Sequence, residues 1–163
     1  MNTAAPAYSV DTSALLDGLE RYYVEDTFPG IWEKVAELID ADRFFISEEV
    51  YEEAKKKTGV VRAWCEKDTT GKLIVPTDGP ITREVQAILK DTPKMVMTMK
   101  GRNRADPFVV AVARLRTATV VTGEGSDGTE DRPKIPYVCA KLTIPCTTFT
   151  ELIRAESWVF KAG

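Results

Sequence analysis

A single carboxylate, Asp11, stands at the end of the first apolar run of the chain. Residues 7–10 favour a β-strand, and a helix is expected to follow at once over residues 13–21. In open α/β sheets, ligands bind outside the carboxyl ends of the strands. Asp11 is therefore well placed to hold a metal ion or a reacting group, although Asp11 or Thr12 could instead simply cap the helix.

Further acids lie in helices or loops that follow predicted strands, or at a predicted helix start: Glu53, Asp106 and Glu124. Glu53 lies in a helix expected after a buried strand over residues 44–46. Asp106 starts an almost wholly apolar helix, and Glu124 follows a β-branched strand over residues 119–122. Strand ends and adjoining helix starts share one rim of a parallel sheet, so these carboxylates are expected to converge. Mg²⁺ or Mn²⁺ would remove their mutual repulsion, and could activate a water and stabilise charge developing on a phosphodiester.

Each acid also has a purely structural interpretation. Asp106 precedes Pro107, which is the pattern of a helix N-cap followed by proline. Glu53 lies four residues before Lys57, a spacing that favours an ion pair on a solvated helix face. Glu124 belongs to a loop rich in glycine and charge. It is the combination of these acids that favours a metal site.

Composition excludes several kinds of chemistry. The chain of 163 residues contains no histidine, which rules out Ser-His-Asp triads and His-ligated zinc. Its formal net charge of −3 is not that of a uniformly basic nucleic-acid binder. The cysteines have no metal-binding spacing, and no apolar run reaches the roughly 18 residues of a membrane span. The start of the chain lacks the pattern of a signal peptide, so a cytoplasmic protein with reduced thiols is expected.

Strands and helices alternate along the chain, without an internal repeat or a clear linker. Further helices are expected to begin at Pro29 after a Thr27 cap, to follow a Ser47 cap as far as Lys57, and to cover residues 60–67, 80–90, 136–142 and 149–156. Further strands are expected at residues 73–75 and 144–148. This alternation predicts one α/β domain with a mainly parallel sheet over residues 7–160, preceded by a disordered N-terminus at residues 1–6.

The order of these motifs resembles that of PIN domains, the metal-dependent ribonuclease fold of VapC-type toxins in bacterial toxin–antitoxin modules. The matching segments are residues 8–13, 46–53, 105–113 and 120–124. A closer resemblance is to a PIN-like subfamily of uncharacterised proteins that carries Val-Thr-x-Glu followed by Ile-Pro-x-Val-Cys. In this chain those motifs are Val121-Thr122-Gly123-Glu124 and Ile135-Pro136-Tyr137-Val138-Cys139.

The resemblance implies a PIN-like three-layer α/β/α sandwich that acts as a Mg²⁺- or Mn²⁺-dependent endoribonuclease, the toxin of a toxin–antitoxin pair. The implied metal ligands and catalytic residues are Asp11, Glu53, Asp106 and, with less weight, Glu124. The hydroxyls implied to support them are those of Thr12, Ser13 and Thr122. PIN nucleases commonly carry an aspartate where this chain has Glu124, which leaves the number of metal ions open. Asp127 is a nearby substitute.

The implied partners are RNA and a cognate antitoxin protein, and a homodimer is also open. RNA would have to approach an acidic site on an acidic protein, and a basic run lies just before Asp106. This run consists of Lys94, Lys100, Arg102 and Arg104. We expect it to hold phosphates beside the metal, unless it is only a solvated loop.

Two rival functions follow from the same residues. The first is a PIN-like module that keeps the acidic site, binds RNA or protein, and cleaves nothing. The second is a phosphatase with Asp11 as its nucleophile. The phosphatase fits less well, because the Asp-x-Asp pattern expected there reads Asp11-Thr12-Ser13. A plain structural α/β domain is the remaining alternative.

Overall fold

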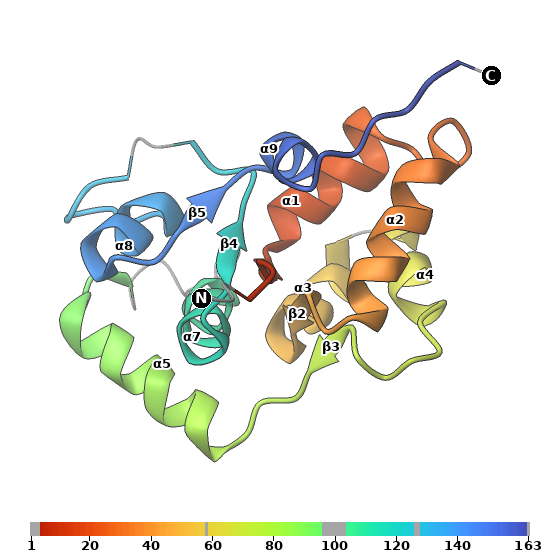
Figure 1. Cartoon of the computed structure of the whole chain (residues 1–163). Coiled ribbons are helices and arrows are strands. Elements are labelled where there is room, and N and C mark those ends of the chain that lie inside the picture. The colour runs from red at the N-terminus through yellow and green to blue at the C-terminus, as the bar shows by residue number, and fades with distance from the viewer. Residues whose placement is uncertain (1–3, 58, 96–103, 126–127, 163) are drawn as a thin grey trace.

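The computed structural model describes residues 4–57, 59–95, 104–125 and 128–162. Within them, parallel strands form one sheet in the order β3-β2-β1-β4-β5. The strands are β1 (Tyr8–Val10), β2 (Phe44–Ser47), β3 (Ile74–Val75), β4 (Thr119–Val121) and β5 (Cys146–Thr147). Helices cover both faces of the sheet, so the expected three-layer α/β/α sandwich with a parallel sheet is confirmed (Figure 1).

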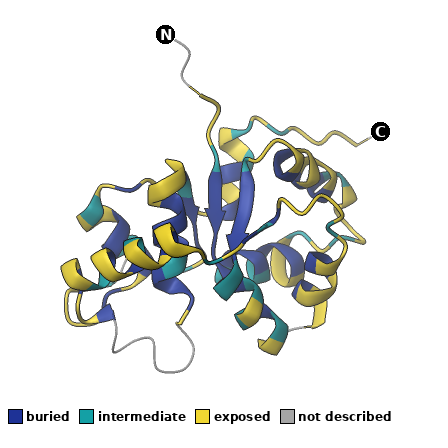
Figure 2. Ribbon diagram, turned by 90° about the horizontal axis from the view of Figure 1, so that it is seen from below, coloured by how far each residue is buried: buried dark blue, intermediate teal, exposed yellow. Residues whose placement is uncertain are grey.

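The helices form the two outer layers. They are α1 (Thr12–Leu16), the π-helix η1 (Asp17–Tyr22), α2 (Pro29–Asp40), α3 (Glu48–Lys57), α4 (Gly59–Glu66), α5 (Gly79–Asp91), α7 (Asp106–Arg116), α8 (Ile135–Leu142) and α9 (Phe149–Ala155). In Figure 1, α5, α7 and α8 lie on one side of the sheet, and α1, α2 and α9 lie on the other. Figure 2 shows the consequence: the central strands β1 and β2 are buried, and the outer faces of the helices are exposed.

Helix α7 is the element that packs most intimately against the centre of the sheet. It contacts β1, β2 and β4, and its first eight residues are buried apart from the half-buried Phe108. The Oγ of Ser9 in β1 donates a buried hydrogen bond of 2.8 Å to the carbonyl of Val109. Because a buried hydroxyl needs such a partner, this bond ties the start of α7 to the middle of β1.

The order of the strands places a topological switch point beside β1. The chain moves from β1 to β2 and β3 on one side, and returns to β4 and β5 on the other. Asp11 follows β1 directly, Thr122 follows β4, and the amide of Asp11 donates to the carbonyl of Val121 at 2.8 Å. Ligands of open α/β sheets bind at such a switch point, outside the carboxyl ends of the strands.

The helix expected over residues 13–21 differs from the observed one in its second half. The α-helical turns end at Leu16, and η1 continues as a π-helix that is closed by the amide of Tyr23 bonding to the carbonyl of Gly18. Gly18 lies against Trp32, where an added Cβ would be 3.0 Å from the ring. This packing involves a distant helix, so the local sequence pattern does not reveal it.

One predicted helix cap is wrong and another is confirmed. Helix α2 has Phe28 at its N-cap, and no side chain caps it, so Thr27 does not have the expected role. Pro29 has no amide hydrogen, so the first turn of α2 has one donor fewer that needs a cap. Ser47 does cap α3, because the amide of Val50 donates to its Oγ at 3.1 Å.

The start of the described chain has no regular secondary structure before β1. The carbonyl of Pro6 accepts a hydrogen bond of 2.7 Å from Nε of Arg43. Residues 1–3, which belong to the segment expected to be disordered, lie outside the described residues. None of the helices in the described part of the chain combines the length and the apolar character that a membrane span requires.

Candidate metal centre

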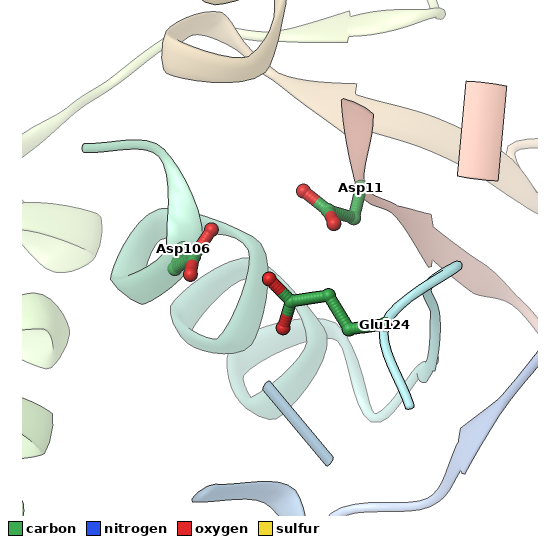
Figure 3. Close-up of side chains that lie close together, drawn as sticks. All are labelled: Asp11, Asp106 and Glu124. Atoms are coloured by element: carbon green, nitrogen blue, oxygen red, sulfur yellow. The ribbon is translucent and has the colours of Figure 1, made fainter. Parts of the chain in front are cut away.

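Asp11, Asp106 and Glu124 come together at the carboxyl edge of the sheet, although they lie far apart in sequence. Each offers a carboxylate oxygen, and these oxygens all lie within 4.8 Å of one another. Figure 3 shows the carboxylates, from the end of β1, the start of α7 and the segment after β4, directed toward one common space. We call these residues the acidic triad.

A pair of hydroxyls fixes the carboxylate of Asp11. Oγ of Ser13 and Oγ1 of Thr122 donate to Oδ2 of Asp11 at 2.6 and 3.2 Å. The amide of Gly123 in turn donates to the Ser13 hydroxyl at 2.9 Å, and that of Glu124 to the Thr122 hydroxyl at 3.1 Å. Each hydroxyl thus accepts from a backbone amide of residues 123–124 and donates to the Asp11 carboxylate. These bonds fix the segment after β4 to Asp11.

The hydroxyl of Thr12 does not take part in this arrangement. Thr12 is buried, and its Oγ1 has no hydrogen-bond partner among the described residues. Asp11 occupies the N-cap position of α1, but its side chain makes no capping bond there. The Asp11 carboxylate instead accepts hydrogen bonds from the hydroxyls of Ser13 and Thr122 and belongs to the acidic triad.

Asp106 is not the helix cap that its place before proline suggests. The N-cap of α7 is Ala105, and no side chain caps the helix. The Asp106 residue is only 4% exposed, and its Oδ2 is buried without a hydrogen-bond partner among the described residues. A buried carboxylate oxygen without a partner costs free energy, unless a proton or a cation satisfies it.

Glu124 is half-buried and is oriented by the start of α8. Its Oε2 accepts a hydrogen bond of 2.9 Å from the amide of Ile135, the first residue of that helix. The first amides of a helix have no partner within it, so a carboxylate is well placed there. The sequence analysis does not predict this role of Ile135. Its position before Pro136, at the start of a helix, could have indicated it.

Glu53 is not among the residues whose carboxylate oxygens lie within 4.8 Å of one another, although its charge contributes to the raised pKa of Asp106. Its role as a ligand stays a prediction. Its Oε1 forms an ion pair with Nζ of Lys57, one turn further along α3. Its Oε2 is buried and has no hydrogen-bond partner among the described residues. Glu124 completes the set of three instead.

Electrostatics show how strongly the carboxylates affect one another. Burial, and then the charges of Asp11, Glu124 and Glu53, raise the pKa of Asp106 to about 9. Burial also raises the pKa of Asp11, against the hydrogen bond from Ser13 that lowers it. The pKa of Glu124 is raised by burial and, further, by Asp11. Carboxylates that hold protons this tightly gain most from a cation in their place.

The donors of the triad fit a hard metal ion. Carboxylate oxygens are the ligands that Mg²⁺, Mn²⁺ and Ca²⁺ prefer, and no histidine or cysteine belongs to the set. The unpartnered Oδ2 of Asp106 adds an independent observation, since it is a buried ligand atom without a protein donor. The acidic triad can therefore hold a metal ion.

The basic run expected to hold phosphates is described only in part. Lys94 forms an ion pair with Asp131, and both side chains are largely exposed. Arg104 is exposed just before α7. Lys100 and Arg102 lie outside the described residues, as does Asp127, the suggested substitute for Glu124. The phosphate-binding role of this run stays a prediction. Lys94 would have to break its ion pair with Asp131 before it could bind a phosphate.

Asp17, which the sequence analysis does not single out, lies against Gly123, the residue before Glu124. A Cβ added at Gly123 would lie 2.3 Å from Oδ2 of Asp17 and 3.1 Å from the carbonyl oxygen of Ser13. Asp17 follows Ser13 by four residues, a spacing that could have indicated a shared helix face. A methyl group at residue 123 would therefore require the Asp17 carboxylate to move away and the backbone at Ser13 to shift slightly.

We therefore expect Gly123→Ala to disturb the triad. The added methyl group should push the Glu124 segment away from α1, lower the free energy of unfolding by about 1–3 kcal/mol, and weaken Mn²⁺ binding by roughly tenfold. Chemical denaturation and calorimetric Mn²⁺ titration measure the two effects. Gly59→Ala is the control, because a Cβ there meets no atom within 4 Å. Unchanged Mn²⁺ affinity in Gly123→Ala would contradict the placement of Glu124 in the site.

The fold and the site define a parallel α/β protein with a cluster of carboxylates, able to hold a metal ion, at the switch point of its sheet. Residues 8–160 match the family DUF4411, described as a domain of unknown function, and the chain belongs to this family. No curated protein matches the chain.

Proposed function

We propose that the protein is a metal-dependent endoribonuclease of PIN-like type, which hydrolyses RNA phosphodiester bonds. The observation that carries the proposal is the convergence of Asp11, Asp106 and Glu124, whose ligand oxygens lie within 4.8 Å of one another. Nucleases of this kind need an oxygen-lined centre for a hard cation, and the absence of histidine leaves few other routes to hydrolysis.

Different residues would bind the metal ion and position its ligands at this site. Asp11, Asp106 and Glu124 would hold Mg²⁺ or Mn²⁺, while the hydroxyls of Ser13 and Thr122 keep Asp11 in position. The bound cation would supply water activation and stabilisation of the charge that develops on the phosphodiester.

The biological role that fits this activity is that of the toxin in a toxin–antitoxin pair, acting on cytoplasmic RNA and bound by a cognate antitoxin. The support is the order of the PIN-like motifs along the chain. A small neighbouring reading frame that encodes a DNA-binding or protease-like protein would favour this role over that of a general ribonuclease.

RNA cleavage by the purified protein is the direct test. With Mn²⁺ and a mixed pool of single-stranded RNA, we expect cleavage that stops when a chelator is added and returns with excess Mn²⁺. Gel analysis of end-labelled RNA records the products. Mn²⁺ binding shown by calorimetry without any cleavage would instead favour the non-catalytic binding module.

A further inference from the structure

Lys57 links the surface of α3 to the edge of the acidic triad. Its Nζ forms an ion pair with Oε1 of Glu53, and the Lys57 and Glu53 side chains are 35% and 15% exposed. The other oxygen of Glu53, Oε2, is buried and has no described hydrogen-bond partner. Glu53 therefore stands with one oxygen toward the ammonium and one toward the protein interior.

The charges of Lys57 and Glu53 both reach Asp106. Glu53 contributes to the raised pKa of Asp106, and Lys57 opposes it. The pKa of Glu53 itself is raised by burial, against the opposing effect of Lys57, and raised further by Asp11. Helix α3, which carries both residues, also packs against α1 and α7, the helices that begin beside Asp11 and at Asp106. The Lys57 ammonium therefore lies on an element next to the triad and provides Glu53 with a counter-charge.

The neighbouring lysines of α3 are arranged differently. Lys55 forms an ion pair of 2.8 Å with Glu52, and its Nζ lies 4.8 Å from the centre of the Tyr51 ring. Lys56 is exposed. Among these three lysines at the end of the helix, Lys57 is the one that contacts a residue beside the acidic triad.

We propose that Lys57 binds a phosphate of the single-stranded RNA backbone adjacent to the acidic triad, exchanging Glu53 for the phosphate when a divalent cation is bound. This inference rests on the proposed function. A bound dication neutralises the carboxylates, so the ammonium is no longer needed there as a counter-charge. Lys57 is also partly exposed, and a lysine ammonium is a common point-charge partner of phosphate. An anionic substrate entering an otherwise acidic site needs such a cation at its edge.

The proposal predicts a specific loss in Lys57→Ala. RNA affinity should fall by roughly 3- to 10-fold, and the slope of log affinity against log salt should flatten by about 0.7, the contribution of one phosphate contact on a single strand. Affinity for Ca²⁺ alone should not fall, because Lys57 does not ligate the ion. Lys57→Arg should retain most of the binding. Lys56→Ala is the matched control, as it removes the same charge from the adjacent position of the same helix.

The experiment uses a short fluorescein-labelled oligouridylate in Ca²⁺, with a neutral methylphosphonate replacing one phosphate at a time. Fluorescence anisotropy measures its affinity for each protein. We expect one position at which the replacement weakens wild-type and Lys56→Ala binding, but does not weaken Lys57→Ala binding any further. Circular dichroism and thermal melting confirm that each variant is folded.

Equal sensitivity of Lys57→Ala and the wild type at every position would overturn the proposal, and would leave Lys57 as a structural partner of Glu53. Failure of the wild type to bind the oligonucleotide in Ca²⁺ would overturn it as well. Binding with the expected position dependence, but without cleavage in Mn²⁺, would reject the ribonuclease activity and still support Lys57 as a phosphate-binding residue. The two failures are thus distinguishable.

Discussion

Asp11→Asn is expected to lower Mn²⁺-dependent RNA cleavage by on the order of 10³-fold or more, with the fold unchanged. Asparagine keeps the shape of the side chain, and its carbonyl oxygen can still accept from the hydroxyls of Ser13 and Thr122. It lacks the negative charge that a hard cation requires. Because Asp11 is 4% exposed, no other carboxylate can move in to replace it without rearranging the triad.

The measurement is single-turnover cleavage of end-labelled RNA, together with Mn²⁺ titration of both proteins. Glu52→Gln is the matched control, because it removes one negative charge from an exposed residue that pairs with Lys55. This control should cleave at the wild-type rate. Cleavage that persists unchanged in Asp11→Asn would point to another site or to a contaminating nuclease.

Asp106→Asn is expected to stabilise the metal-free protein by roughly 2–4 kcal/mol at pH 8. The pKa of Asp106 is about 9 in the folded protein, against an ordinary value of 3.8. As pH rises from about 4 to about 9, the unfolded chain releases this proton while the folded protein keeps it. The free energy of unfolding of the metal-free protein therefore falls over that interval. Asparagine has no charge to bury, so it removes this dependence.

Urea denaturation at several pH values between 6 and 8, with a chelator present, tests this expectation. The chain has no histidine, so apart from the other buried carboxylates of the site, whose pKa values are also raised, few groups titrate in this interval. Saturating Mn²⁺ should reverse the order of stability, because the wild type gains more binding free energy than the variant. Asp131→Asn, at an exposed residue paired with Lys94, should change stability little at any of these pH values. A less stable Asp106→Asn in chelator would show that the carboxylate has a structural role.

Much of the layout of this protein is local in origin, and sequence patterns could predict it. The β-branched and aromatic runs of β1, β2 and β4 and the apolar repeat of α7 mark their own elements. Asp11 and Asp106 lie within a residue of an element boundary, so their place at the carboxyl edge followed from the alternation of strands and helices. Where packing acts from a distance, the prediction failed. Gly18 against Trp32 accompanies the unexpected π-helix η1.

The composition of the acidic triad was decided by tertiary structure. From sequence, Glu53 and Glu124 are both candidate ligands, and their local patterns do not show how close each carboxylate comes to Asp11. In the fold, the amide of Ile135 orients Glu124 toward Asp11 and Asp106, whereas Glu53 pairs with Lys57 on its own helix. The sequence by itself determined that acids gather at one edge of a parallel sheet, because strand ends share that edge. For Glu124, a place beside Asp11 and Asp106 depends on the amide of Ile135, which belongs to another element, and only the folded chain brings that amide to it.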